Sequence, residues 1–219
     1  MYLPAHFTIA DHDFAFDLID NLRLGTLVVQ TADGLDATPL PFLLQREVGD
    51  HGRLVAHLSR ANRLWSRVDT AREALVMFQG PQGYVSPGWY PSKVEAGPVA
   101  GGRVVPTWNY VAVHAYGTLS VHDDRDWVEQ QVRTLTEQHE SAMPRPWSVD
   151  DAPAEYIESM LRGIVGLQFD ITRLEAKAKL SQNRPADVVG VVAGLRTGGP
   201  TDSLLADTMQ TMQTGESDD

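Results

Sequence analysis

Short apolar runs separated by turn residues predict a series of consecutive β-strands. Five such runs span residues 25–31, 38–45, 54–59, 74–78 and 104–122, and a sixth spans residues 164–174. Asp33-Gly34, Gly49-Asp50 and Asp69-Thr70 separate the first four runs and are typical turn or break signals. The fifth run is long enough to bend around a sheet, so we expect a long curved strand there.

A helical period of apolar residues occurs in four other segments. Phe14, Leu18 and Leu22 are four residues apart, and Asp11 precedes them as a cap, which predicts a helix over residues 11–22. Residues 124–140, 153–161 and 185–195 are also predicted to form helices. The helices stand at the ends of the strand series instead of alternating with the strands, which favours an antiparallel barrel over a parallel sheet.

The predicted fold class is therefore mainly β with helices (α+β), in a single domain. This domain covers residues 1–200 and has a helical extension from about residue 185. Residues 201–219 are expected to form an acidic, disordered tail. The chain contains no G-x-G-x-x-G and no G-x-x-x-x-G-K-[ST] motif, so the sequence does not favour a Rossmann or a P-loop fold.

Composition limits the environment and the partners of the chain. Its 219 residues include no cysteine, which excludes disulfides, thiolate metal sites and cysteine nucleophiles. No apolar run approaches the ~18 residues of a membrane span, and no signal peptide is recognisable, so we expect a cytoplasmic protein without membrane association. The net charge of −11 does not favour nucleic-acid binding, although DNA is left open as a partner. Residues 53–72 carry five arginines and one acid, which allows a local anion site.

The string VPTWNYVAVHAYG, residues 105–117, combines two chemistries on one predicted strand. Because side chains alternate between the two faces of a strand, small or β-branched residues share one face with Thr107 and Asn109. Trp108, Tyr110 and other aromatic rings occupy the opposite face. Exposure of those rings is unfavourable, so either a helix of the same chain or a second subunit is expected to cover them.

Three further segments carry similar groups: HLSRANRLW (57–65), YVSPGWYPSK (84–93) and KAKLSQNR (177–184). Together they offer hydroxyls, amides and cations for a phosphate, and aromatic rings for a flat heterocycle. Each segment also has a purely structural interpretation. The arginines are typical of a solvated face, the tryptophan is typical of packing in a turn, and His57 is typical of a hydrogen-bonded core residue. The spacing of the histidines supports no metal site.

Taken in order, FQGPQGYVSPGWYPSK, VVPTWNYVAVHAYG, DDAPAEYIESMLRGIVGLQFDI and LEAKAKLSQNRP resemble the PaiB family of FMN-binding negative transcriptional regulators. MYLPAHF and HLSRANRLW also fit, so the resemblance runs from Met1 to about Leu195. It implies an FMN-binding split β-barrel related to pyridoxamine-phosphate oxidases, and a homodimer with FMN at the interface.

The same resemblance implies a set of FMN-binding residues. Those expected near the phosphate are His57, Arg60 and Asn62. Those expected to line the pocket are Ser86, Trp89, Tyr90, Thr107, Trp108 and Asn109, and those expected to close it are Lys179 and Gln182. No residue is singled out as catalytic.

Two departures from the family pattern concern this site. AGPVAGGR, residues 96–103, replaces a short HGK link, with Arg103 in place of the lysine, which could alter substrate access or flavin retention. Asn62-Arg63-Leu64 replaces the usual Asn-Pro-Gln, which places the phosphate contacts in question.

Three functions agree with these observations. The first is a flavin-binding dimer that represses transcription, directly or through a partner. The second is an FMN-dependent oxidoreductase, similar to a flavin reductase or a pyridoxamine-phosphate oxidase, that acts on a small molecule. The third is a flavin-free interaction dimer whose pocket has decayed.

Overall fold

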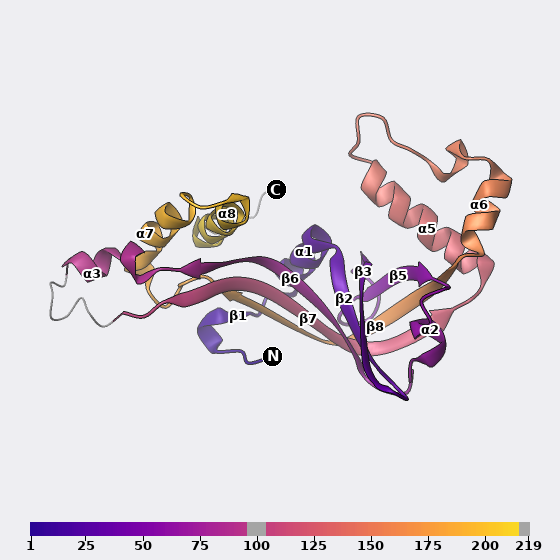
Figure 1. The fold of residues 1–219 in the computed structure, drawn as a ribbon, viewed down its shortest axis with the longest axis horizontal. Helices are drawn as coiled ribbons and strands as arrows, with labels where there is room; N and C mark the ends of the chain where they lie inside the picture. The colour runs from indigo at the N-terminus through magenta and orange to yellow at the C-terminus, as the bar shows by residue number, and fades with distance from the viewer. Residues whose placement is uncertain (96–103, 215–219) are drawn as a thin grey trace. The chain divides into compact units, whose positions relative to one another are not determined.

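The structure is a computed structural model, and it describes residues 1–95 and 104–214. It is a mixed α+β fold with an eight-stranded antiparallel sheet (Figure 1). The strands are β1 (Thr8–Ile9), β2 (Leu24–Thr31), β3 (Gly34–Pro41), β4 (Leu43–Gln45), β5 (Arg53–Ser59), β6 (Ala74–Val85), β7 (Thr107–His122) and β8 (Ile164–Lys179). Seven of them follow the order β3-β2-β6-β7-β8-β5-β4, and β1 also pairs with β8.

Helices precede, interrupt and follow the sheet along the chain. The α-helices are α1 (His12–Leu22), α2 (Leu64–Arg67), α3 (Pro91–Glu95), α5 (Arg125–Glu140), α6 (Ala154–Leu161), α7 (Pro185–Leu195) and α8 (Pro200–Thr214). Single 3₁₀ turns are η1 (Ala5–Phe7), η2 (Pro87–Trp89) and η3 (Val149–Asp151). No helix in residues 1–95 and 104–214 is long and apolar enough to span a membrane.

The chain divides into two compact units. The first unit comprises residues 1–11, 79–113 and 175–219, and the second comprises residues 12–78 and 114–174. Strands β6, β7 and β8 contribute residues to both. The predicted single domain over residues 1–200 stays a prediction.

The second unit contains the larger apolar core. Strands β2 and β3 form a hairpin whose turn places Gly34 at a φ of 116°, in the left-handed region that glycine adopts without strain. Leu27, Val76 and Phe78 are fully buried. Helix α5 packs on β5, and its Trp127 joins a cluster of Leu43, Val55 and Leu135.

The first unit contains a smaller core between α7, α8 and η2. Helices α7 and α8 lie against each other (Figure 1), and Leu205, Ala206 and Met209 of α8 are buried. Gly190 and Gly194 of α7 allow Trp89 to approach closely. A Cβ at Gly194 would be 2.2 Å from the Trp89 ring. Helix α8 occupies residues 200–214, which include most of the segment 201–219 that was expected to be a disordered tail. Its few apolar residues stabilise it through contact with α7, which its acidic composition did not reveal.

The predicted elements agree with the structure for α1, α5, α6 and α7, which were expected over residues 11–22, 124–140, 153–161 and 185–195. The expected strand over residues 38–45 is instead interrupted at Phe42, between β3 and β4. Strands β6 and β8 continue past their predicted ends. The burial of β7 alternates as predicted, with Asn109, Val111 and Val113 buried and Trp108 exposed.

Candidate functional site

The end of β8 carries two lysines on one face of the first unit. Lys177 and Lys179 are two residues apart and therefore point to the same side of the strand. The Lys179 ammonium donates to the Thr107 hydroxyl oxygen and to the Trp108 carbonyl oxygen, both at 2.5 Å. Lys177 is only 5% exposed and donates to the Tyr2 carbonyl oxygen at 3.0 Å. Both lysines thus contact neutral oxygens.

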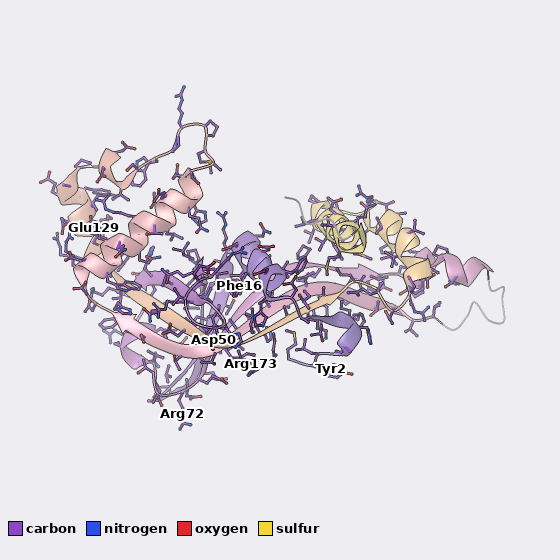
Figure 2. All side chains as sticks on the ribbon, turned by 180° about the vertical axis from the view of Figure 1, so that it is seen from behind. Tyr2, Phe16, Asp50, Arg72, Glu129 and Arg173 are labelled. Carbon is purple, nitrogen blue, oxygen red and sulfur yellow. The ribbon has the colours of Figure 1, made fainter. Side chains whose placement is uncertain are left out.

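Aromatic rings complete the surroundings of the lysine pair. The Lys177 ammonium is 5.5 Å from the centre of the Tyr2 ring and 5.2 Å from that of the Tyr110 ring. Tyr2, labelled in Figure 2, belongs to the N-terminal segment of the same unit. The Lys179 ammonium is 5.9 Å from the centre of the Phe7 ring. Cation–π contacts stabilise an ammonium group only partly, so they do not replace an anionic partner.

No described carboxylate forms an ion pair with Lys177 or Lys179. The nearest acid along the strand, Glu175, forms an ion pair with the Met1 amino group at 2.5 Å. Burial, and then repulsion from Lys177, lowers the pKa of Lys179. Two buried or half-buried cations without a carboxylate are unfavourable unless an external anion compensates them.

Asn109 and Gln182 stabilise the turn that follows β8. Asn109 is fully buried, and its amide nitrogen donates to the Ser181 hydroxyl oxygen at 3.0 Å. Ser181 has a φ of 67°, so this hydrogen bond supports a backbone conformation that serine rarely adopts. The Gln182 side chain accepts from the Leu180 backbone N–H at 2.7 Å and donates to the Ala178 carbonyl at 2.6 Å. The turn that follows Lys179 is thereby fixed.

The segment 84–93 has a mainly structural role in the unit. The Ser86 hydroxyl accepts from the Gly88 backbone N–H at 3.1 Å, and the Trp89 ring lies against Gly194. Tyr90 is 3% exposed, burial raises its pKa, and the Arg184 guanidinium lies 5.4 Å from its ring centre. Contact between this segment and FMN stays a prediction.

Trp108 is the predicted site residue with the largest exposed aromatic surface. It is 49% exposed, and its indole N–H donates to the Gln82 side-chain oxygen at 3.0 Å. The Tyr84 ring is 48% exposed and lies edge-on to it, with ring centres 6.4 Å apart. The pair offers exposed aromatic surface, with Trp108 on β7, the strand of Thr107, and Tyr84 on β6.

The three residues predicted near the phosphate belong to the second unit, and each has a partner there. His57 Nδ1 is 2.8 Å from the Gln131 side-chain oxygen, and Arg60 forms an ion pair with Asp123. Asn62 accepts from the Leu64 backbone N–H at the start of α2. The structure therefore brings eight of the eleven predicted residues into the first unit and three into the second. A shared role in FMN binding stays a prediction, and residues 96–103 lie outside the described residues.

Lys177 lies in the segment 177–184 whose cations were expected to suit a phosphate, but it was not among the residues predicted to bind FMN. The sequence pattern could have indicated it, because residues two apart on a strand point to the same face, as Lys177 and Lys179 do. Tyr2 was also missed, because a contact between the N-terminal segment and β8 depends on the pairing of Thr8 with Lys177. A non-local pairing of this kind leaves no local pattern.

The residues of the first unit fit FMN chemically. Two cations without a carboxylate suit an anionic cofactor, and the exposed indole of Trp108 in the same unit suits a flat ring. The fold and this group together define a flavin-binding split-barrel protein. The chain belongs to the family described as "Putative FMN-binding domain", whose model matches residues 1–173. This assignment gives FMN as the cofactor and confirms the family predicted from the sequence.

One curated relative matches nearly the whole chain. "Protease synthase and sporulation protein PAI 2" of Bacillus subtilis is 30% identical over 212 residues, covering 96% of this chain and 97% of the relative. "Uncharacterized protein AN0679" of Emericella nidulans is 35% identical over 234 residues, covering 91% of this chain and 92% of the relative. The chain is thus similar to relatives from a bacterium and a fungus.

Solved structures share the fold at low sequence identity. The flavocytochrome Anf3 from Azotobacter vinelandii is 13% identical with a TM-score of 0.53, and the match covers 81% of this chain and 72% of that chain. The FAD and haem binding protein from Mycobacterium smegmatis is 18% identical with a TM-score of 0.50, covering 78% and 73%. These likenesses concern the fold alone and agree with a split barrel.

Proposed function

We propose that Lys179, supported by Lys177, is the main cationic contact of FMN, and that Trp108 and Thr107 border the same site. The observation that carries this proposal is the Lys179 ammonium, which is half-buried, donates to two neutral oxygens and is repelled by Lys177. A negative charge next to it would satisfy both lysines. Lys179 then also stabilises the negative charge that reduction adds to the flavin ring.

Titration of the full chain with FMN and with riboflavin tests the position of this cation. Riboflavin has the same ring system and lacks the phosphate. If Lys179 contacts the ring, Lys179→Met weakens both flavins by a similar factor, about 10- to 100-fold for a charge-assisted hydrogen bond. A loss confined to FMN would place Lys179 at the phosphate instead.

The second part of the proposal is a homodimer with FMN at the interface between the two copies. The exposed Trp108 and Tyr84 rings support it, because apolar surface left in water costs about 25 cal/mol per Å². We expect Trp108→Ala combined with Tyr84→Ala to shift the sedimentation coefficient toward the monomer. Trp147→Ala is the matched control, because Trp147 is 44% exposed and belongs to the second unit. A monomeric parent protein would contradict the dimer.

The third part is a regulatory role of the PaiB type that does not depend on direct DNA contact. The name of the Bacillus subtilis relative, which refers to protease synthesis and sporulation, supports regulation. The paired arginines of residues 53–72 argue against a DNA-binding surface. Arg53 pairs with Asp170 at 2.6 Å, Arg60 with Asp123, and Arg67 with Asp33. Arg72 pairs with Asp69 at 3.5 Å, so four of the five arginines are compensated.

A gel shift at low salt tests direct DNA binding, because phosphate contacts are strongest there. We expect no retardation of a DNA fragment by the FMN-loaded protein. Retardation would contradict this expectation. Its loss in an Arg63→Gln variant would then place the DNA contact at Arg63, the arginine of residues 53–72 for which the structure records no ion pair.

An FMN-dependent oxidoreductase is the second candidate, and the position of Lys179 favours it. An ammonium beside the flavin favours the reduced, anionic ring and thus electron uptake. Anaerobic mixing with NADH and with NADPH tests this candidate by the loss of the visible flavin band. Reduction by neither nicotinamide would leave the regulatory role as the better account.

A further inference from the structure

A surface hollow lies in the second unit, between the C-terminal half of α5 and the segment that connects α5 with η3. Its volume is about 470 Å³, which falls within the range of about 300–1,000 Å³ that is common for small-molecule sites. Helix α5 contributes Arg133, Glu137 and Glu140 to the walls, and the connecting segment and η3 contribute Trp147 and Val149. None of the residues predicted to contact FMN lines this hollow.

The connecting segment places an exposed indole at the hollow. Trp147 follows Pro146 and is 44% exposed. Its backbone N–H donates to the Glu140 carboxylate at 2.8 Å, which attaches the segment to the last turn of α5. Directly after it, the Ser148 and Asp151 side chains form a capping box at the start of η3. The backbone that carries the indole is therefore anchored on both sides, and the ring is available to a flat or cationic ligand.

Arg133, which lines the hollow, is compensated by carboxylates of the same unit. Its guanidinium is 2.9 Å from a carboxylate oxygen of Glu129, which is labelled in Figure 2, and 2.9 Å from a carboxylate oxygen of Asp150. Because these two acids balance its charge, Arg133 adds little positive charge for an anionic ligand.

Two carboxylates of the hollow are not compensated in this way. The Glu140 carboxylate accepts from the Trp147 backbone N–H, and neither it nor Glu137 forms an ion pair within residues 1–95 and 104–214. Both lie in the last turn of α5, three residues apart, where they repel each other and the negative end of the helix dipole. Arg23 reaches this end of α5 with its guanidinium 2.6 Å from His139 Nδ1, but His139 does not line the hollow. A positive charge placed in the hollow would therefore relieve the repulsion.

We propose that this hollow binds a small organic cation in which an amidinium or guanidinium group is joined to an apolar body. The planar cation donates to the Glu137 and Glu140 carboxylates, which suit its several N–H groups. The apolar body lies on the Trp147 ring. The site goes beyond the FMN function proposed above and does not rest on it.

Benzamidine and benzamide form a matched pair of probes, because they have nearly the same size and shape and only benzamidine is positively charged at neutral pH. Binding is measured by calorimetry on the full chain saturated with FMN. We expect saturable binding of benzamidine that is at least about tenfold tighter than that of benzamide. Absence of saturable benzamidine binding would overturn the proposal, and so would equal affinities for the two probes.

Paired substitutions of glutamate locate the cation. Glu137→Gln combined with Glu140→Gln removes both charges and keeps an oxygen that can accept from the Trp147 backbone N–H. This variant should reduce the preference for benzamidine over benzamide to less than about threefold. Glu73→Gln combined with Glu155→Gln is the control, because it removes two charges from exposed positions of the same unit that do not line the hollow. A preference that survives in the first variant, or that is lost in the control, contradicts the proposed site.

A substitution of the tryptophan tests the contact with the apolar body. Trp147→Leu keeps an apolar side chain and its backbone N–H but removes the aromatic ring. Because a cation is attracted to the face of an indole, this variant should weaken benzamidine about two- to tenfold in the same calorimetric titration. Unchanged affinity would contradict the proposed position of the ligand.

Discussion

In the first unit, Lys177 and Lys179 donate to carbonyl and hydroxyl oxygens, whereas in the second unit Arg53, Arg60 and Arg67 each pair with a carboxylate. The arginines are therefore compensated within the chain. The lysines are not compensated by any described carboxylate. An acidic protein with a net charge of −11 thus retains, at the end of β8, two cations that no described carboxylate compensates. The comparison teaches that a high number of cations in a sequence segment does not by itself predict an anion site. The prediction also requires knowing whether carboxylates of the same chain pair with those cations.

The largest effect on stability is expected from removing the buried lysine charge. In the absence of FMN, Lys177→Met should raise the free energy of unfolding by about 1–3 kcal/mol, because a desolvated ammonium without a carboxylate is replaced by an apolar side chain of similar length. Urea denaturation of the flavin-free protein measures this change. A destabilised variant would mean that the contacts with Tyr2 and Tyr110 outweigh the desolvation of the ammonium.

The opposite sign and a smaller size are expected for an arginine of the second unit. Arg53→Met should lower the free energy of unfolding by about 0.5–1 kcal/mol, since it leaves Asp170 with the Gln168 hydrogen bond alone and the pair is partly exposed. The same urea measurement compares the two variants directly. If both variants shifted stability in the same direction, the contrast between the two units would be lost.

A dependence of FMN affinity on alkaline pH is the smallest expected effect. Burial and then Lys177 lower the pKa of Lys179. Its ammonium therefore loses its proton at a lower pH than an ordinary lysine, and FMN affinity should fall as the pH rises through that pKa. In the flavin-free protein, the free energy of unfolding changes with pH in the opposite direction to the FMN affinity. A lysine with a depressed folded-state pKa adds stability as the pH rises from that pKa toward the ordinary lysine value. Titrations of FMN at increasing pH check the first effect, and Lys179→Met should remove it.

Most of the secondary structure could be predicted because it depends on local periodicity. The α5 and α7 patterns place apolar residues on one side over several turns, and the burial of β7 alternates between its two faces except at Ala112, which is buried as well. Helix α8 could not be predicted in the same way, because it is stabilised by tertiary contacts: it packs on α7, Leu205 lies against Gly83, and Met209 lies against Asn109.

The candidate site was predictable in its residue types but not in its partners. Lys179, Thr107 and Trp108 were selected by the family resemblance, and the structure brings them within hydrogen-bond distance in one unit. His57 contacts Gln131, and Arg60 forms an ion pair with Asp123; both partners are more than sixty residues away in sequence. No local pattern indicates such pairs, so a solvent-exposed arginine and a compensated one look alike in the sequence.

The most direct test of the lysine site is a fluorescence titration of FMN with Lys179→Met and with Lys93→Met. Lys93 is the one lysine of the chain outside the pair, and it is exposed on α3 in the same unit. The account predicts that Lys179→Met weakens FMN about 10- to 100-fold while Lys93→Met leaves the affinity unchanged. Equal affinities of the two variants and the parent protein would contradict it.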